Sequence, residues 1–570
     1  MYLGIDLGTT NTVVSRSFAD ADNKLITEVV QMGQMCNDNW EKFPTLPSMV
    51  YFEDDSIIVG REAKRQREWD HENVVTNAKR FMGTQKIWKI DGVEYQAKDI
   101  AAIVLQHCKK TIDREGNMSY DSVVITVPAS FNPDQIADTL RAAKQAGFSD
   151  DQVIIKHEPT AALLSFIDSE AKKGDQEKFI DFSEPKRVLV FDLGGGTCDT
   201  SVIDVQVSQG EFHFTEKGIG RYQELGGIDF DAKLAEGLLN AYFEKEKIYA
   251  GDISEEEKEE LYLKLLLAAE TIKEKISSNI YAKLSTEDNV DVESIKVKHN
   301  IPDFYHRKPY RIVITKAEYD QYTNALYVDD GIIYKKFEDM DKHKNIISVI
   351  RKTLEDYEIP KSSIDYVFAT GGMSQFLTVK QKLGEYLGCP IITPENPMDA
   401  VARGASIYQY YKVREDREDA RSDKDTAKGT AEEASSEGII DTMMLAESIL
   451  LDMNEGLPRV IIPKKTVVPY EGEILGEFKT TSPSGVKLNI YAAEDEYDSS
   501  MRIQKSLEKR FVYPAPSGTP FDIIYKINEN KAIDMKILLH DSRNQAIDFS
   551  VRSDLKITEQ NYKIKMEEDE

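Results

Sequence analysis

The chain has few of the features that mark secreted, membrane-spanning or nucleic-acid-binding proteins. Its four cysteines in 570 residues, Cys36, Cys108, Cys198 and Cys389, include no Cys-x-x-Cys pair, which argues against a disulfide framework or metal cluster and favours a reducing compartment. No apolar run approaches the ~18 to 20 residues of a membrane span, and no signal-peptide pattern opens the sequence. The net charge of −28 opposes binding to nucleic-acid phosphates. We therefore expect a cytoplasmic protein whose partners include neither a membrane nor nucleic acid.

Two segments repeat one pattern. Residues 2–14 and 188–203 each contain an apolar strand, Asp-Leu-Gly, a turn of Gly and Thr, and a second apolar strand. Glycines in such a turn tolerate positive φ and let a ligand approach the backbone, so that successive N–H groups can bind an anion. Asp6 and Asp192, one at each strand end, are placed to face a hydrated metal ion. The pair of hairpins predicts a duplicated fold that holds a nucleoside triphosphate between its halves.

Further glycine-rich turns extend this prediction. Residues 369–375 follow a predicted strand, and open α/β sheets bind ligands at the carboxyl ends of their strands. Residues 226–229 either contact the ligand or simply begin a helix. The residues expected to contact the nucleotide in these turns are Gly8, Thr9, Thr10, Asn11, Gly194, Gly195, Gly196, Thr197, Gly226, Gly227, Gly371, Gly372 and Ser374.

The chain divides into four parts by composition. Residues 1–412 alternate strands and amphipathic helices, as in an α/β domain that binds a nucleotide. Residues 413–441 are highly charged and predict a flexible linker, the alternative being a helical extension of the preceding helix. Residues 442–556 show short alternating runs separated by turns, which predict an all-β sandwich. Residues 557–570 form an acidic tail.

The motifs of residues 1–412 resemble those of the 70-kDa heat-shock chaperone family, whose nucleotide domain belongs to the actin and sugar-kinase superfamily. They occur in order and at family-like spacing. The segments that carry the resemblance are Asp6–Asn11, Val127–Ala129, Glu158–Ala162, Asp192–Thr197, Leu225–Gly227 and Thr370–Gly372. The resemblance implies a duplicated, actin-like α/β ATPase domain followed by a β-sandwich domain that binds peptides.

The resemblance also implies roles for single residues. Lys79 matches a lysine that contacts the γ-phosphate and orients the attacking water; without the family it would be read as an exposed helix lysine. Thr197 matches a hydroxyl near the phosphates. An acidic cluster would hold Mg²⁺ through water, mainly at Asp6 and Asp192, and position water and K⁺. Its members are Asp6, Glu158, Asp192 and Asp199. The residues expected at the ribose and adenine of ATP or ADP are Glu270, Lys273 and Ser277.

Several positions depart from the family pattern. Gln375 stands where many relatives carry an arginine that stacks on adenine. Ile136 and Ile154 stand where arginines often couple the nucleotide state to the linker and to J-domain co-chaperones. Two segments resemble the short apolar linker of the family, residues 439–441 and 449–452. We prefer the first, since the second then opens the β domain. The chain stops without a long helical segment after the strands, so we expect a β domain without the usual helical lid.

Two functions follow. The first is an ATP-driven chaperone in which ATP binding and hydrolysis modulate weak, fast binding of extended unfolded peptides, with a J-domain co-chaperone and a nucleotide exchange factor as candidate partners of a monomer. The second is a specialised ATP-dependent switch or scaffold that holds one dedicated partner. A metabolic kinase would leave the β domain without a role. Stimulation of ATP hydrolysis by unrelated peptides would separate the first function from the second.

Overall fold

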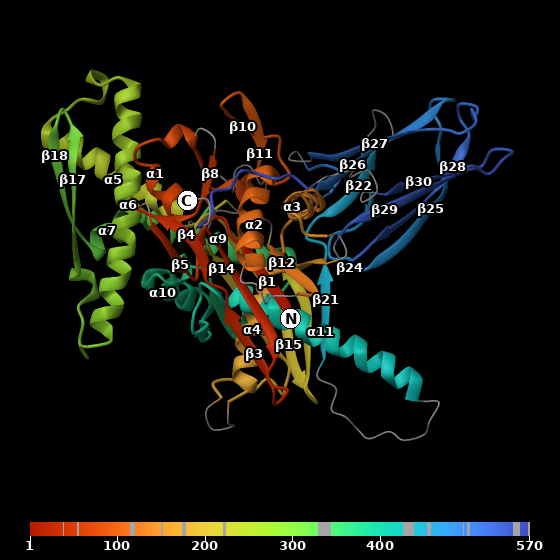
Figure 1. Ribbon diagram of the computed structural model, residues 1–570, viewed down its shortest axis with the longest axis horizontal. Helices are drawn as coiled ribbons and strands as arrows, with labels where there is room; N and C mark the ends of the chain where they lie inside the picture. Colours follow the sequence, from red (N-terminus) through yellow and green to blue (C-terminus); the bar gives the residue numbers. More distant parts are fainter. Residues whose placement is uncertain are drawn as a thin grey trace.

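The N-terminal domain contains two sheets with the same strand order (Figure 1). The computed structural model describes residues 1–37, 39–53, 56–114, 120–149, 152–173, 178–220, 224–328, 344–425, 438–452, 458–493, 495–498, 502–529, 531–550 and 559–567. The first sheet has the order β13-β12-β1-β2-β3 and the second begins β20-β19-β14-β15-β16. Each is an antiparallel meander of three strands with two further strands added in parallel at one edge. This equivalence confirms the predicted duplication.

The bounds of the strands follow the two predicted hairpins closely. Those of the first sheet are β1 (Tyr2–Leu7), β2 (Asn11–Ala19), β3 (Leu25–Val29), β12 (Ser122–Val127) and β13 (Val153–His157), with β6 (Leu46–Pro47) paired to β2. Those of the second are β14 (Lys186–Leu193), β15 (Cys198–Ser208), β16 (Glu211–Ile219), β19 (Tyr366–Thr370) and β20 (Ile391–Ile392).

Two helices fill the space between the sheets. Helices α4 (Glu158–Ala171) and α11 (Ala400–Asp425) share one hydrophobic core with residues from both sheets. Gly404 allows them to touch, because a Cβ at this position would lie 1.6 Å from the carbonyl oxygen of Ala161. This close contact ties the two halves together beneath the paired turns.

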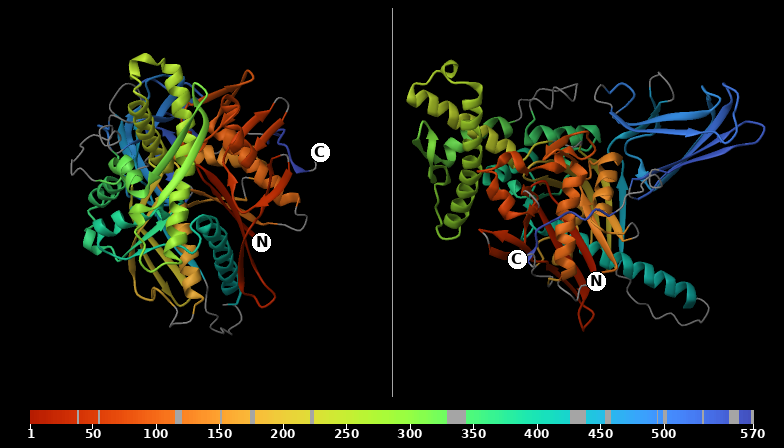
Figure 2. Two further views of the ribbon diagram at one scale, coloured as in Figure 1. Left: turned by 90° about the vertical axis from the view of Figure 1, so that its left-hand side faces the viewer. Right: turned by 45° about the horizontal axis from the view of Figure 1, so that its top comes forward.

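Other helices and small sheets complete the two lobes (Figure 2). The first lobe adds α1 (Arg61–Gln66), α2 (Ala97–Arg114), α3 (Pro133–Gln145), β4 (Met32–Cys36), β5 (Asn39–Phe43), β7 (Val50–Glu53), β8 (Ser56–Val59), β9 (Val74–Val75), β10 (Ile87–Ile90) and β11 (Val93–Gln96). The second lobe adds α5 (Gly227–Glu246), α6 (Glu255–Leu284), α7 (Lys316–Thr323), α9 (Ile346–Asp356), α10 (Leu377–Leu387), β17 (Lys296–Tyr305) and β18 (Lys308–Thr315).

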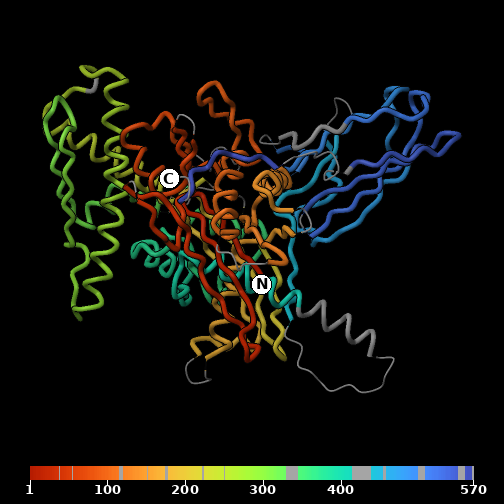
Figure 3. Tube along the Cα trace, viewed as in Figure 1, coloured from red at the N-terminus to blue at the C-terminus, as the bar shows by residue number. Residues whose placement is uncertain are grey.

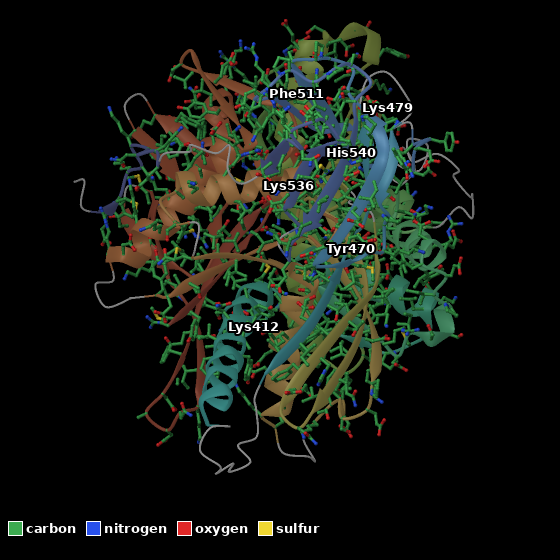
Figure 4. The ribbon with its side chains drawn as sticks, turned by 90° about the vertical axis from the view of Figure 1, so that its right-hand side faces the viewer. Lys412, Tyr470, Lys479, Phe511, Lys536 and His540 are labelled. Carbon is green, nitrogen blue, oxygen red and sulfur yellow. The ribbon has the colours of Figure 1, made fainter. Side chains whose placement is uncertain are left out.

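The β domain is a sandwich of two four-stranded sheets around its own core, as predicted. One sheet has the order β23-β22-β26-β27, with β22 (Ser448–Asp452), β23 (Arg459–Ile462), β26 (Gly485–Ala493) and β27 (Arg502–Arg510). The other has the order β25-β28-β29-β30, with β25 (Tyr470–Lys479), β28 (Pro520–Ile527), β29 (Ile533–Leu539) and β30 (Ala546–Ser550). Figure 4 looks onto the edge strand β25 between Tyr470 and Lys479.

The segment between the domains differs from the predicted flexible linker. Helix α11 continues to Asp425, so residues 413–425 follow the alternative of a helical extension, while residues 426–437 lie outside the described part of the chain. Residues 439–444 then form strand β21 (Ile439–Met444), which pairs in parallel with β16 and antiparallel with β24 (Val467–Val468). Residues 449–452 lie in β22 of the sandwich, and the choice of residues 439–441 as the linker stays a prediction.

The C-terminal segment also differs from the expected separate acidic tail. Residues 559–567 run across the first lobe (Figure 3), where Ile564 and Met566 are buried in its hydrophobic core. Within the described ranges, no helix is both long and apolar enough to cross a membrane.

Candidate functional site

The two predicted turns lie against each other where the lobes meet. A Cβ at Gly195 would lie 1.8 Å from Oγ1 of Thr10, and one at Gly196 would lie 2.6 Å from Cγ2 of Thr9. The hydroxyls of Thr9 and Thr10 are buried, and neither has a hydrogen-bond partner within the described part of the chain. Buried polar groups are normally paired. These hydroxyls therefore fit a polar ligand at the turns, such as the oxygens of a phosphate.

Four carboxylates and one lysine lie behind the turns. Lys79 is buried and forms an ion pair with Glu158, with Nζ 2.5 Å from Oε1. Burial and the charge of Glu158 raise the pKa of Asp6 to about 7. The same causes raise the pKa of Asp199 to about 7, although it accepts a hydrogen bond from Ser130. Burial and the charges of Glu158 and Asp199 also raise the pKa of Asp192. One lysine among these carboxylates leaves excess negative charge, which a cation would offset.

This acidic cluster fits Mg²⁺ held through water. Over the ranges that the structure describes, no set of three or more His, Cys, Asp or Glu side chains is placed to hold a metal ion directly. Mg²⁺ commonly keeps several waters and binds through one or two carboxylates together with substrate phosphates. Asp6 and Asp192 lie near the ends of the equivalent strands β1 and β14, one in each half of the domain.

Residues 226–229 begin a helix that supports the second turn. Gly226 is the N-cap of α5, and its N–H donates to Asp229 at 2.7 Å. The N–H groups of Gly227 and Ile228 donate to the carbonyl oxygens of Gly194 and Gly195 at 3.0 and 2.8 Å. The helix interpretation of this motif is therefore correct. Its first amides hold the 194–197 turn in place, a role that the spacing alone did not predict.

The third glycine motif lies beside the second turn. Gly371 has φ +83°, and a Cβ there would lie 2.3 Å from Oδ1 of Asp192. The hydroxyl of Ser374 donates to the carbonyl oxygen of Gly371 at 2.7 Å. Gln375 is the residue that departs from the family pattern. Its Oε1 accepts a hydrogen bond from Nζ of Lys380 at 2.9 Å, and its backbone carbonyl oxygen accepts one from the hydroxyl of Tyr281 at 2.5 Å. Lys380 and Tyr281 were not predicted, because only the fold brings α10 and α6 to this turn.

Of the three residues expected at the nucleoside, two form ion pairs. Glu270 bridges the lobes, since its two carboxylate oxygens contact Lys64 at 2.7 Å and Arg67 at 2.9 Å. Lys273 contacts Asp231 at 2.6 Å. Ser277 lies half-buried on the same helix, α6. Lys64 and Arg67 were also missed, because no local pattern relates them to a residue about 200 positions away.

The ion pairs of Glu270 predict an effect on nucleotide release. The charges of Lys64 and Arg67 lower the pKa of Glu270 to about 2 against the opposing effect of burial. We expect Glu270→Gln to raise the rate of ADP release about tenfold, because the lobes lose their charged bridge. Stopped-flow fluorescence of a labelled ADP measures the rate. Glu260→Gln, on the exposed face of α6 and paired with Lys264 on the same helix, serves as the control, and equal rates in both variants would contradict a bridge between the lobes.

A second polar cluster surrounds the linker strand β21. Lys156 is buried, forms an ion pair with Asp441 and lies 4.1 Å from the centre of the Tyr408 ring. His157 contacts Glu216 at 2.6 Å, and Glu216 accepts from the N–H of Met444 at 2.8 Å. Lys156 lies two residues beyond Ile154 on β13, and its pairing with Asp441 was not predicted from the sequence.

The β domain contributes one buried lysine to this region. Lys531 is 2% exposed, and its Nζ donates to the carbonyl oxygen of Ala129 in the N-terminal domain at 3.1 Å. Burial lowers the pKa of Lys531 to about 8, despite the charges of Glu216 and Glu447. The linker cluster and Lys531 therefore join the two domains through buried polar contacts.

Comparisons with known proteins agree with this geometry. The Hsp70 protein family model matches residues 2–90, 84–302 and 315–536. The chaperone protein DnaK of Mycoplasmopsis agalactiae is 28% identical over 541 residues, which span 93% of this chain and 75% of that relative. The DnaK proteins of Thermosipho melanesiensis and Thermosipho africanus are 28% and 27% identical, and each alignment spans 91% of this chain and 74% of the relative.

These matches favour the chaperone over the alternative of a dedicated switch or scaffold. They also support the actin-like ATPase domain and β sandwich expected from the motifs. Family members use nucleotide with Mg²⁺ and bind unfolded polypeptides. The chain therefore belongs to the Hsp70 family, as an ATP-hydrolysing, ATP-dependent chaperone of that type.

Proposed function

We propose that ATP binds where the two lobes meet, with its phosphates at the two turns and its nucleoside against α6 and the 371–375 turn. The buried, unpaired hydroxyls of Thr9 and Thr10 and the close approach of these two side chains to Gly195 and Gly196 support the phosphate position. Gly371, Gly372, Ser374, Lys273 and Ser277 border the nucleoside side. Glu270 supports this side through its bridge to α1 rather than through a free carboxylate.

Within this proposed site, Lys79 supplies the positive charge that neutralises the transferred phosphoryl group. It lies buried among carboxylates, and the charges of Glu158 and Asp6 raise its pKa against the effect of burial, so it carries its proton at neutral pH. Phosphoryl transfer depends chiefly on positioning and charge neutralisation, and Mg²⁺ supplies further positive charge at the phosphates. Glu158, Asp199 and the hydroxyl of Thr197 would accept or orient the attacking water. The excess of carboxylates also suits K⁺ as a second, monovalent cation.

The pairing of strand β21 is the observation that supports coupling between ATP binding and the β domain. This strand pairs with β16 on one side and with β24 on the other, so the sheet that contains Asp192 continues into the β-domain connection. A change between the lobes can therefore act directly on the docked β domain. Extended polypeptides would add as a strand to an exposed edge of the sandwich, such as β25, where Leu475 is 59% exposed.

The proposal is tested by steady-state ATP hydrolysis with Mg²⁺ and K⁺, with and without a panel of unrelated extended apolar peptides. We expect several peptides to stimulate hydrolysis, and replacement of K⁺ by Na⁺ to reduce the rate. Hydrolysis that no peptide changes would contradict coupled chaperone activity. Adding a J-domain protein or an exchange factor to the same assay tests these proposed partners. Sedimentation tests whether the protein is a monomer, as proposed. Cell fractionation tests the proposed cytoplasmic location.

The pKa of Lys531 predicts that docking of the β domain strengthens at high pH. The group titrates near 8 when docked and near 10.5 in water, so below pH 8 it is charged in both states and the docking equilibrium is constant. Between these values docking releases a proton, which favours the docked state by about tenfold between pH 7 and pH 9. Energy transfer between dyes on the two domains measures docking. Lys531→Met should remove the pH dependence of docking. An unchanged pH dependence in that variant would show that another group causes it.

A further inference from the structure

The first lobe contains a groove occupied by an extended segment of the chain itself. Ile564 and Met566 are each 3% exposed and belong to the hydrophobic core formed by α2, the first sheet and the small sheet β8-β7-β9. Tyr562 packs against the same core. Figures 1 and 3 show the segment running from the side of the β domain across the lobe. Alternate side chains are thus inserted into the domain, as when a strand is added to a sheet.

One wall of the groove recognises the backbone of the segment through an edge strand. β8 is the edge strand of its three-stranded sheet. The N–H of Ile57 donates to the carbonyl oxygen of Lys563 at 2.9 Å, and the N–H of Lys565 donates to that of Ile57 at 2.9 Å. These two bonds form a parallel bridge between Ile57 and Ile564. The segment therefore covers backbone groups that would otherwise be open to pairing with another chain.

The opposite wall recognises the same backbone through buried Gln106. Its Nε2 donates to the carbonyl oxygen of Gln560 at 2.6 Å, and its Oε1 accepts from the N–H of Tyr562 at 3.1 Å. Gln106 is 3% exposed, and a buried amide is stable only when its polar atoms are bonded. The N–H of Gln560 also donates to the carbonyl oxygen of Gln145 at 3.1 Å. Two walls thus match an extended backbone.

We propose that this groove is a binding site for residues 559–567, and that the bound segment acts as a clasp that holds the β domain on the N-terminal domain. The last β-domain strand, β30, ends at Ser550, and residue 559 follows it by nine positions in the sequence. Together with the linker strand β21, the clasp ties the β domain down at both of its ends. A second tether raises the effective concentration of the docked state without any new contact at the main interface.

The clasp goes beyond the proposed function, because it requires neither hydrolysis nor peptide binding. Its test is hydrogen exchange of the full chain with MgATP present, read at two amides. The Ile57 amide reports the groove, since it bonds to Lys563, and the Met444 amide reports domain docking, since it bonds to Glu216. Protection of amides in the 8–11 turn by MgATP reports nucleotide binding separately, so a failure of the nucleotide site is distinguishable.

The variant is Ile564→Asp, with Lys563→Asp as its matched control. The two substitutions place the same aspartate one residue apart, and the control makes the larger change in net charge because it also removes a lysine. Ile564 is buried, whereas Lys563 is exposed and contributes its carbonyl to the pairing with Ile57. We expect Ile564→Asp to speed exchange about tenfold at both the Ile57 and Met444 amides, and Lys563→Asp to change neither more than about twofold. Gln106→Leu, on the other wall, should speed exchange at the Tyr562 amide.

Each result decides the proposal. Unchanged exchange at Ile57 in Ile564→Asp, with Gln106→Leu also silent at Tyr562, would show that the segment does not occupy the groove. Faster exchange at Ile57 with an unchanged Met444 amide would overturn the clasp. Faster exchange of both amides in the control as well would assign the effect to charge rather than to the groove. Unchanged exchange in strand β12 verifies that each variant is folded.

Discussion

Replacing Lys79 with alanine is expected to lower the kcat of ATP hydrolysis by about 10²- to 10³-fold and to change nucleotide affinity by no more than about threefold. Lys79 is the lysine inside the carboxylate cluster, where it pairs with Glu158. In the proposed site its charge acts on the transferred phosphoryl group during the reaction, whereas the turns and Mg²⁺ would bind the ground state. Single-turnover hydrolysis and equilibrium binding of a labelled nucleotide separate the two effects.

The control for Lys79→Ala is a lysine of the same lobe without a buried partner. Lys89 pairs with Glu94 on the surface, where their side chains are 73% and 54% exposed, and exposed pairs contribute little. Lys89→Ala should leave kcat and affinity unchanged. Lys79→Ala also leaves Glu158 without its ion pair, so we expect a lower melting temperature in the absence of Mg²⁺. A kcat near that of the native protein, in a folded variant, would remove Lys79 from the chemistry.

Asp441→Leu is expected to uncouple the domains. The substitution leaves the Lys156 ammonium buried without its carboxylate, which costs the docked state about 3 kcal/mol, or roughly a hundredfold in the docking equilibrium. The variant should hydrolyse ATP at its basal rate but lose stimulation by peptides. Interdomain energy transfer and peptide-stimulated hydrolysis measure the two effects. Ile440→Ser alters the neighbouring linker residue, whose side chain is 47% exposed, and should remain coupled.

The double variant Lys156→Met/Asp441→Leu tests whether the ion pair itself causes the loss. Replacing a buried pair with apolar side chains of similar volume is often neutral, so docking should recover to within about threefold of the native protein. Lys156→Met alone should resemble Asp441→Leu, because either change leaves one buried charge unpaired. A double variant as defective as the single variants would mean that packing of β21, rather than the pair, determines docking.

Local sequence patterns indicated several parts of the candidate site. The two Asp-Leu-Gly hairpins and the Thr370–Gly372 turn are short glycine-containing turns at strand ends, whereas Glu158 was indicated by the family resemblance. The structure brings these segments together, and their contacts with a nucleotide stay a prediction. The strands of the β domain were also predictable, since alternation and turn residues are local signals. Residues 413–425 were not, because charged side chains are compatible with both a solvated helix and a flexible linker.

Residues joined across long sequence distances could not be predicted. Lys64 and Arg67 meet Glu270, Lys156 meets Asp441, and Ile564 pairs with Ile57. The ion-paired side chains leave no periodic trace in the sequence, because each of them alone resembles an ordinary surface or core residue. Composition made residues 557–570 appear to be an acidic tail, although alternate apolar side chains at positions 562, 564 and 566 were a signal that could have suggested a strand.

The sequence by itself determined the duplicated nucleotide-binding fold, the phosphate turns and the β sandwich, because glycines, strand-end carboxylates and alternating apolar residues act within a few positions of one another. Only the tertiary structure decided how the parts are connected: the bridge between the lobes, the pairing of β21 with β16, and the groove for residues 559–567. These contacts pair buried charged and polar groups, and bury apolar side chains, with partners hundreds of residues away in the sequence. Buried polar groups are stable only when they are paired, and that pairing exists only once the chain has folded.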